Sequence, residues 1–437
     1  MISIFLVIAL IPFFNENIEK SLFILLIIVI WNILGTLLKN FTVSSFLILL
    51  IFLPFNITFQ LPISQSSFIN GILVNYLIPT ISIVDFFVFL ILISMILEGR
   101  VNLEKKGFNF LKIFILFSIF LILQNIFKGS STTIVNSLRL LLYVFTFYNL
   151  KKNSKEILKN NLLFIILIIS IISVLFQGII SLLQFSGGSS VGVSFLGESE
   201  VVNGMIGSSF LELNNALYLR GYGTFPHPNV LGGWLIFNIL LGWYLFDNMQ
   251  KKRDSAILLM GISSLVLIFT FSRVSWLVCI TIWLAFIIKT FVKSKGKIFS
   301  FIPLLFERVS NLFNGGDTSW NDRLNLIKSS FYIIKNNLLF GVGAGNFTNS
   351  MGNTVPITSN GILLLQPVHN IFLLMFSELG LVGTGLFGTL LYFFFKERKW
   401  SLRFVLSLVS IFVIGIFDHY MFSLPQGLGI FFLMIIL

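Results

Sequence analysis

Long apolar segments separated by short polar gaps recur along the whole 437-residue chain. A transmembrane helix needs about 20 mostly apolar residues. Apolar side chains make up 56% of the sequence and charged ones only 11%, more apolar surface than one soluble core can bury. We therefore expect an all-α, polytopic integral membrane protein, a single transmembrane domain over residues 1–437 with about 12–14 transmembrane helices. The segments are 2–14, 21–38, 41–55, 82–97, 108–127, 132–150, 162–183, 230–246, 256–271, 274–288, 371–395, 402–417 and 420–437.

The basic residues indicate the orientation of these segments. The chain has 29 Lys and Arg residues against 17 Asp and Glu, a net charge of +12, and most of the basic residues lie in short gaps between apolar segments. Such gaps mark the cytoplasmic side, which argues against nucleic acid as the partner of this charge. They are Lys39; Arg100, Lys105, Lys106 and Lys112; Lys151, Lys152, Lys155 and Lys159; Lys251, Lys252 and Arg253; Lys289, Lys293, Lys295 and Lys297; Lys396, Arg398, Lys399 and Arg403.

Nine basic residues fall on the opposite, outward side, and five of them are arginines. Because basic residues are disfavoured there, we interpret the arginines as ligands of an anion bound through their paired guanidinium donors. The alternative is snorkelling to the interface or contact with lipid headgroups. The nine residues are Lys20, Lys128, Arg139, Arg220, Arg273, Arg308, Arg323, Lys328 and Lys335.

Two segments are predicted to be external loops, over residues 186–226 and 307–367. The second contains a predicted amphipathic helix over 320–338, which we expect to lie on the outer surface as a lid with its apolar stripe against the membrane helices. Only the short stretch 298–306 is left to cross the membrane before this loop. Either the chain crosses here in a thinned or re-entrant way, or one of the predicted helix orientations is wrong. The stripe is Trp320, Leu324, Ile327, Phe331, Ile334 and Leu338.

Polar residues gather where predicted helices begin on the outward side. His227, His369 and His419 all fall at outer helix ends, where an imidazole beside cations stays neutral and accepts a proton, or makes an interfacial hydrogen bond. Residues 220–229, RGYGTFPHPN, predict a tight turn into a helix whose N-terminus suits a phosphate, or a rigid turn without a ligand. Arg273 lies in or beside the membrane, where a charge costs about 2.5–3.5 kcal/mol.

Other polar features give weaker indications. Glu378 lies within an apolar segment and needs a basic partner or a proton. Residues 341–345, GVGAG, follow no predicted strand, so a backbone nest or a close packing turn fits better than a nucleotide site. No metal site is predicted, because the histidines are far apart in the sequence and the outward carboxylates lack ligand spacing. These carboxylates are Asp85, Asp317, Asp322 and Asp418.

Four motifs in order resemble the O-antigen ligase and O-antigen polymerase superfamily of membrane-embedded glycosyltransferases. They are RGYGTFPHPN at 220–229, FSR at 271–273, Arg323 with GVGAGNF at 341–347, and HN at 369–370 with ELG at 378–380. Upstream, the hydropathy pattern and the segment YLIPTISIVD at 76–85 are similar as well.

The resemblance implies an inverting, metal-independent glycosyltransferase without a cofactor, in the bacterial cytoplasmic (inner) membrane. The donor is then a glycan on a polyprenyl pyrophosphate, such as undecaprenyl pyrophosphate, and the active site faces outward. Arg220 and Arg273 match the arginines that hold the pyrophosphate as leaving group, and His369 matches the histidine that deprotonates or orients the acceptor hydroxyl. We expect further substrate contacts from Arg323, Arg139, His227, Asn229 and Asn370.

The motifs leave three acceptors open: another lipid-linked repeat unit for a polymerase, a lipid core for a ligase, or a protein side chain. The first two belong to polysaccharide biosynthesis for the cell envelope. A transporter or flippase of lipid-linked oligosaccharides is the competing function, because it also presents arginines to a pyrophosphate. Transporters commonly show inverted repeats and polar groups near the midplane. We see neither in this sequence, and its polar groups gather on one face, which favours chemistry at that face.

Overall fold

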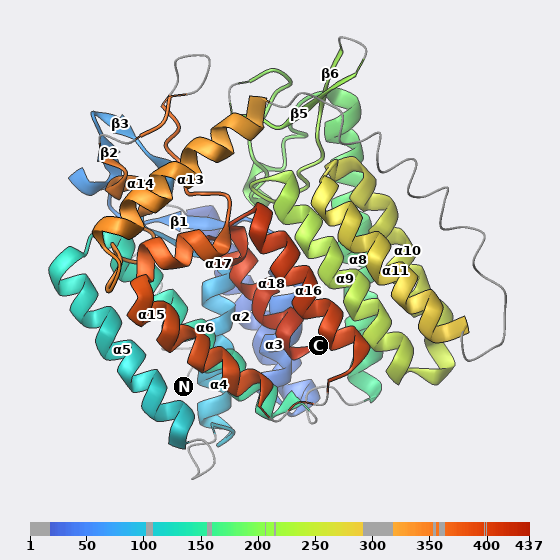
Figure 1. Ribbon diagram of the computed structural model, residues 1–437. Coiled ribbons are helices and arrows are strands. Elements are labelled where there is room, and N and C mark those ends of the chain that lie inside the picture. The colour runs from blue at the N-terminus through green and yellow to red at the C-terminus, as the bar shows by residue number, and fades with distance from the viewer. Residues whose placement is uncertain are drawn as a thin grey trace.

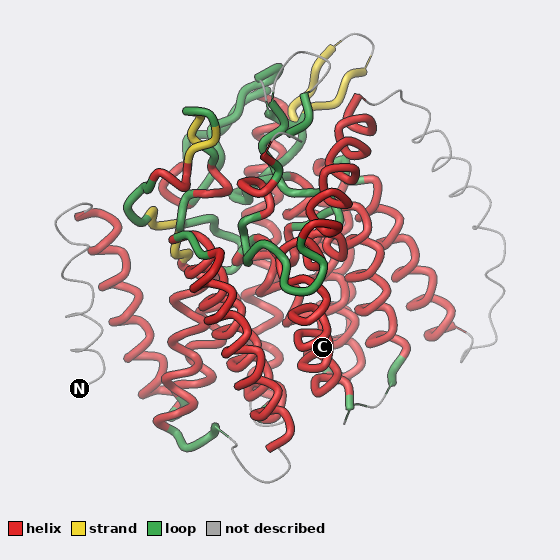
Figure 2. Tube along the Cα trace, turned by 60° about the vertical axis from the view of Figure 1, so that its left-hand side comes forward, coloured by secondary structure: helices red, strands yellow, loops and turns green. Residues whose placement is uncertain are grey.

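The computed structural model describes residues 18–101, 108–154, 160–205, 207–213, 216–291, 318–352, 355–357, 363–396, 398 and 400–437. Helices dominate these residues and run side by side as a bundle (Figures 1 and 2), which confirms the all-α fold. The predicted span 2–14, the crossing at 298–306 and Arg308 lie outside the described residues.

Among the described residues, six helices are long and apolar enough to cross a membrane, by length and composition, so a polytopic membrane protein is confirmed. They are α5 (Phe108–Lys128), α8 (Asn160–Gly187), α9 (Pro228–Asn248), α10 (Arg253–Thr270), α11 (Arg273–Phe291) and α15 (Ile371–Phe395). Five further apolar helices are α2 (Ile18–Leu38), α3 (Phe41–Phe52), α4 (Ile83–Leu97), α16 (Leu402–Phe417) and α18 (Pro425–Ile436). The remaining ones are α6 (Ser131–Lys152), α13 (Thr318–Asn336), α14 (Phe347–Ser350) and α17 (Tyr420–Ser423). The total of about 12–14 spans stays a prediction.

The predicted last span, 420–437, is wrong as one continuous helix. The chain forms the short helix α17, leaves helical geometry at Leu424 and begins again as α18 at Pro425. A proline has no N–H to donate to the preceding turn, so it suits the first position of a helix and ends the one before it.

Three two-stranded antiparallel sheets, two of them hairpins, lie together at one end of the bundle, which we call the hairpin end (Figure 2). Strand β1 (Thr58–Gln60) pairs with β4 (Thr80–Ser82), β2 (Phe68–Ile69) with β3 (Ile72–Leu73), and β5 (Phe210–Leu213) with β6 (Ala216–Leu219). The described residues of the two predicted external loops include β5, β6, α13 and α14, which lie at this end (Figure 1).

The opposite, basic end is tied together by side chains from several of the basic gaps. Asp247, at the end of α9, accepts hydrogen bonds from Lys289 and Arg403 at 2.9 and 3.0 Å. Lys151, at the end of α6, donates to the carbonyl of Phe394 near the end of α15. The gaps predicted to share one side of the membrane therefore meet at one end of the bundle.

Helix α9 is the central helix and links the two ends. Most of its residues are buried, and it packs against α8, α10, α11, α16 and α18 (Figure 1). Its 21 residues extend about 30 Å, from the hairpin end at Pro228 to the basic end at Asn248.

The GVGAG segment is a close packing turn that docks on a kink in α15. Gly380 has φ +65° and interrupts the helix, and the N–H groups of Val342 and Gly343 donate to the exposed carbonyls of Ser377 and Glu378 at 3.0 and 2.9 Å. A Cβ atom on Gly380 would lie 2.4 Å from the backbone nitrogen of Gly341, so only glycine permits this approach. The Glu378 carboxylate is buried and accepts a long, 3.4 Å hydrogen bond from the N–H of Phe347.

Helix α13 covers the predicted amphipathic segment to within two residues at each end, but our prediction of its buried face is wrong. Leu326, Ser330 and Ile333 are buried, whereas Phe331 and Leu338 of the predicted stripe are exposed. The helix packs on α15 through the face that carries small serines. In a membrane protein an apolar side chain need not face protein, because lipid is equally apolar.

Candidate functional site

The residues that the sequence singles out come from separate segments at the hairpin end. Arg220, His227 and Asn229 precede or begin α9, Arg273 begins α11, and His369 precedes α15. The connection between α16 and α17 adds a further pair, Asp418 and His419. Three helix N-termini and a short loop therefore surround one region, and helix N-termini favour negatively charged groups.

Arg220 is held by neutral acceptors. Its Nε donates to the carbonyl of Thr270 at 2.7 Å, and its Nη2 donates to Oδ1 of Asn229 at 2.8 Å. Burial, helped by the positive charges of Arg323 and Arg273, lowers the pKa of Arg220 to about 10, against the opposing effect of Tyr222 and Asp418. Arg220 stays charged at neutral pH, and its charge interacts with those of the other two arginines.

We call Arg220, Arg273 and Arg323 the arginine cluster. Each comes from a different element: the segment before α9, the start of α11 and the first turns of α13. Like charges within interaction range repel one another, so the cluster is stabilised when an anion binds between them.

His227 fixes the start of α9 through both ring nitrogens. Its Nδ1 accepts the N–H of Asn229 at 3.1 Å as the helix N-cap, and its Nε2 lies 2.8 Å from Oγ of Ser209. Burial and then the charge of Arg220 lower the pKa of His227 to about 3, so the ring is neutral. Its predicted contact with substrate stays a prediction.

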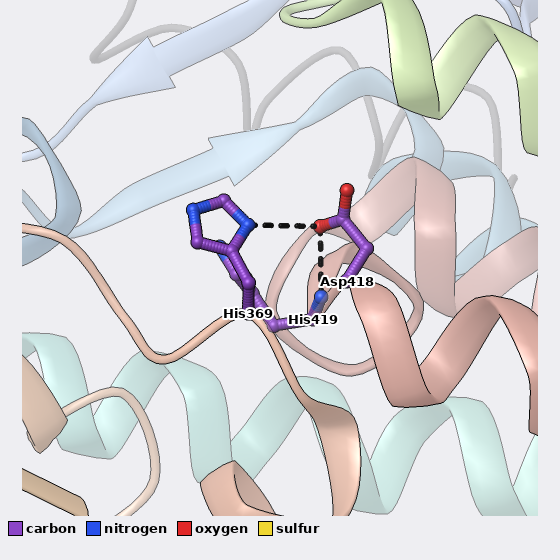
Figure 3. A group of neighbouring side chains, drawn as sticks. All are labelled: His369, Asp418 and His419. Atoms are coloured by element: carbon purple, nitrogen blue, oxygen red, sulfur yellow. Dashed lines mark hydrogen bonds and ion pairs between the residues drawn. The ribbon is translucent and has the colours of Figure 1, made fainter. Parts of the chain in front are cut away.

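A chain of polar contacts runs from Arg220 to His369. Asn229, which accepts from Arg220, donates through Nδ2 to Oδ2 of Asp418 at 2.8 Å. The other oxygen of Asp418, Oδ1, accepts the backbone N–H of His419 at 2.8 Å and lies 3.7 Å from Nδ1 of His369 (Figure 3). One carboxylate therefore faces both the arginine side and the histidine.

Asp418 is the negative group at the centre of this chain. Burial alone would raise its pKa, but the neighbouring imidazoles of His369, His419 and His227 outweigh burial and hold it below its usual value. Burial lowers the pKa of His419 to about 4, with His369 adding to the effect, so His419 is neutral. A carboxylate against Nδ1 of His369 favours the tautomer that carries its proton on that nitrogen.

His369 is accessible, with 19% of its side chain exposed, whereas His419 is buried. Their ring centroids are 5.2 Å apart. In Figure 3 the second ring nitrogen of His369, Nε2, points away from Asp418. Asn370 positions His369, because its side-chain oxygen caps the N–H groups of Phe372 and Leu373.

Arg139 lies in different surroundings. Nε and Nη2 donate to the two carboxylate oxygens of Asp85, each at 2.8 Å, while Nη1 donates to Asn136 at 2.5 Å and Nη2 also donates to the carbonyl of Thr80. Only 8% of Arg139 is exposed. Protein groups therefore engage each nitrogen of this guanidinium, and its predicted contact with substrate stays a prediction.

One protein-family model matches part of the chain. Residues 229–388 match the O-antigen ligase family model. The match supports a place for the chain in the O-antigen ligase and polymerase superfamily, which confirms the resemblance read from its motifs. No curated protein matches the chain.

The match to the O-antigen ligase family model, together with the apolar helices, supports a multi-pass membrane enzyme that transfers glycans, with a lipid-linked glycan donor and a glycan acceptor in general terms. The matched segment contains Asn229, Arg273, Arg323 and His369. Arg220 and the Asp418–His419 pair lie outside it and join the site only through the fold.

One feature of this O-antigen ligase-like site was missed from the sequence. His369, Asp418 and His419 each offer a ligand atom, and these atoms all lie within 4.8 Å of one another (Figure 3). The prediction of no metal site relied on their separation in the sequence, which the fold removes. Asp418 and His419 are adjacent and follow an apolar segment, and that was the one local signal available.

Proposed function

We propose that the protein is an inverting, metal-independent glycosyltransferase that uses a polyprenyl-pyrophosphate-linked glycan on the outer face of the cytoplasmic membrane. The observation that carries the proposal is the line of contacts from Arg220 through Asn229 and Asp418 to His369. It joins a cluster of cations, suited to a pyrophosphate, to an accessible imidazole, suited to a hydroxyl group.

The arginine cluster binds the pyrophosphate of the donor. As the bond between the anomeric carbon and the phosphate oxygen breaks, the electron pair stays on the pyrophosphate, and negative charge grows there. Guanidinium groups already in place stabilise that charge, an effect of about 10²–10³ in rate for one well-placed donor.

His369 removes the proton from the acceptor hydroxyl. Asp418 faces Nδ1, so Nε2 accepts the proton while the hydroxyl oxygen forms its bond to the anomeric carbon. The imidazolium that results is stabilised by the carboxylate of Asp418. Attack by one acceptor oxygen, opposite the leaving pyrophosphate, inverts the anomeric centre.

The test uses the purified protein in lipid nanodiscs with a synthetic polyprenyl-pyrophosphate-linked N-acetylhexosamine as donor. We expect His369→Ala to lower transfer by about 10²-fold or more while donor binding is retained, the scale of a lost general base. Undiminished transfer by His369→Ala would remove this histidine from catalysis. Movement of the lipid-linked sugar across the bilayer without transfer would favour the transporter instead.

A chelator tests whether transfer is independent of metal ions. This test matters because three side chains that could bind a metal ion lie together. We expect wild-type transfer to be unchanged in EDTA. If EDTA abolishes transfer and one divalent ion restores it, the metal-free mechanism is wrong. A metal ion bound by His369, Asp418 and His419 would then take part in the reaction.

The outward location is tested by labelling. In a Cys279→Ser background, single cysteines at exposed positions of each end, Phe195 in the first predicted external loop and Trp400 at the basic end, are treated with a membrane-impermeant maleimide on intact cells. We expect Phe195→Cys to be labelled and Trp400→Cys to be protected. The reverse pattern would place the site on the cytoplasmic side.

A further inference from the structure

The aromatic side chain of Tyr76 lies next to the candidate site, beside His419. Tyr76 lies in the short 3-10 helix Asn75–Leu77, between the strands β3 and β4. Its ring centroid is 6.0 Å from that of His419, which in turn is 5.2 Å from that of His369. Tyr76 is 40% exposed, so part of its ring is open to a ligand.

The surroundings of Tyr76 differ in charge from the arginine cluster. Tyr76 lines a cavity together with polar side chains that bind hydroxyl groups well, among them Asn136, Glu378 and Ser423. Arg139 is the one cation among the described residues of this lining, and Asp85 neutralises it. The cavity has a volume of only about 40 Å³, which admits a hydroxyl group of a ligand but not a whole sugar ring. Its lining therefore suits a hydroxyl group of an uncharged ligand better than a second phosphate.

The cavity adjoins the pair formed by His369 and His419. Ser423 lines it and lies 2.7 Å from Nδ1 of His419 through its Oγ. Pro367, two residues before His369, is also part of the lining. A ligand resting on Tyr76 is therefore next to His369, on a side that the arginine cluster does not line.

The segment that carries Tyr76 is held firmly. The carbonyl of Leu77 accepts hydrogen bonds from the hydroxyls of Ser67 and Thr132 at 3.0 and 2.5 Å, and the N–H of Val74 donates to the carbonyl of Ser67 at 3.0 Å. These contacts involve the backbone beside Tyr76 and leave its ring free to bind. They also mean that replacing the side chain leaves the segment in place.

We propose that Tyr76 binds the acceptor, with its ring stacked on the apolar face of a sugar ring and the acceptor hydroxyl directed to His369. An aromatic ring supplies a flat apolar surface, and neighbouring amide, hydroxyl and carboxylate groups fix the orientation of the ligand. The arginine cluster takes the donor, and Tyr76 takes the acceptor beside His419 and His369. This inference rests on the proposed glycosyl transfer and assigns its two substrates to separate places.

Binding is measured first, without turnover, by saturation-transfer NMR with a panel of p-nitrophenyl hexosides and N-acetylhexosaminides. The protein is held in nanodiscs, because detergents with sugar headgroups would compete. We expect saturation of sugar ring protons with wild type and Tyr76→Phe, and its loss with Tyr76→Ala. Tyr392→Ala is the matched control, since Tyr392 is 53% exposed and lies near the far end of α15.

Kinetics then separate the two substrates. We expect Tyr76→Ala to raise the KM for the glycoside acceptor by about tenfold, the loss of one aromatic contact, and to leave the KM for the pyrophosphate-linked donor unchanged. A change in donor KM alone, or unchanged saturation transfer in Tyr76→Ala, would overturn the assignment. So would a wild type that saturates no glycoside of the panel.

The two proposals fail in different ways. If wild type binds the glycosides through Tyr76 but transfers no sugar from the pyrophosphate donor, the glycosyltransferase proposal fails while the carbohydrate site at Tyr76 remains. If wild type transfers sugar and Tyr76→Ala behaves as Tyr392→Ala does, the acceptor site lies elsewhere and the glycosyltransferase proposal stands.

Discussion

Two buried arginines near the hairpin end have opposite electrostatic surroundings. Arg139 forms a two-point ion pair with Asp85, which also accepts the hydroxyl of Tyr143 at 2.9 Å. Arg220 donates to a carbonyl and an amide oxygen, neither of which carries a charge. The first arginine is neutralised by a carboxylate of the protein, whereas the second donates to uncharged acceptors among the described residues.

The difference shows that two arginines at similar positions in the sequence can have different roles. Both arginines are predicted to lie on the outward side, so the sequence makes both candidates for anion binding. The carboxylate of Asp85, on α4, distinguishes them. Because the guanidinium of Arg139 already donates to both oxygens of this carboxylate, Arg139 has little to gain from binding a phosphate. We therefore expect Arg220 to matter for donor binding and Arg139 for stability.

The largest effect is expected from Arg220→Gln, which removes the charge at the arginine cluster. Transfer should fall by about 10²-fold or more, and Arg220→Lys should recover only part of it, because an ammonium lacks the fork of donors. Initial rates with the pyrophosphate donor measure this. The control Arg253→Lys, at the basic end, should behave as wild type; an Arg220→Lys enzyme of full activity would show that charge alone suffices.

The converse effect is expected from Asp85→Asn, which leaves Arg139 buried without its counter-charge. Breaking a buried ion pair costs about 3–5 kcal/mol, so the thermal unfolding midpoint in nanodiscs should fall clearly. Asp247→Asn is the control, because its pairs with Lys289 and Arg403 are more exposed and worth about 1 kcal/mol or less. Equal midpoints for Asp85→Asn and Asp247→Asn would contradict the distinction between the two arginines.

A smaller effect is expected from Asn229→Ala, which cuts the link between Arg220 and Asp418. Each of these partners keeps its other contacts, so we expect transfer to fall by about tenfold, from the loss of one or two hydrogen bonds to charged groups. Steady-state kinetics of both substrates check this. Asn248→Ala at the far end of the same helix is the control, and Asn229→Ala with wild-type kinetics would show that the link is not used.

The smallest effect concerns pH. His227 and His419 have folded pKa values of about 3 and 4, below the ordinary 6.5, so between these values the unfolded chain takes up protons that the folded protein does not. Stability therefore falls as the pH drops below about 6.5, by at most about 1.4 kcal/mol per pH unit for each histidine. His227→Asn keeps a side chain that caps α9 and should flatten the dependence of the unfolding midpoint on pH between 6.5 and 4.5. An unchanged slope would show that His227 is charged in the folded protein.

The sequence predicts the apolar helices and the shared end of the basic gaps well, because both depend on local composition. Apolar length sets the helices, and the basic gaps do meet at one end through Asp247. The sequence also places His369 and His227 at helix starts, since Pro367 and Pro228 lie beside them. These features need no knowledge of which helices are neighbours.

The partners of the site residues could not be predicted in the same way. Asp418 is 189 residues from Asn229, and Asp85 is 54 residues from Arg139, so no spacing pattern connects them. The buried face of α13 was missed for a related reason, because an apolar stripe does not reveal whether it meets protein or lipid. Such contacts depend on the packing of the bundle.

The most direct test of the account is donor binding, since it separates Arg220 from Arg139 without catalysis. A fluorescent polyprenyl-pyrophosphate donor is titrated against wild type, Arg220→Gln and the double variant Arg139→Met with Asp85→Leu, which replaces the ion pair by apolar groups. We expect Arg220→Gln to weaken binding by about tenfold or more with an unchanged unfolding midpoint, and the double variant to bind as wild type does. Wild-type affinity in Arg220→Gln, or loss of binding only in the double variant, would contradict the account.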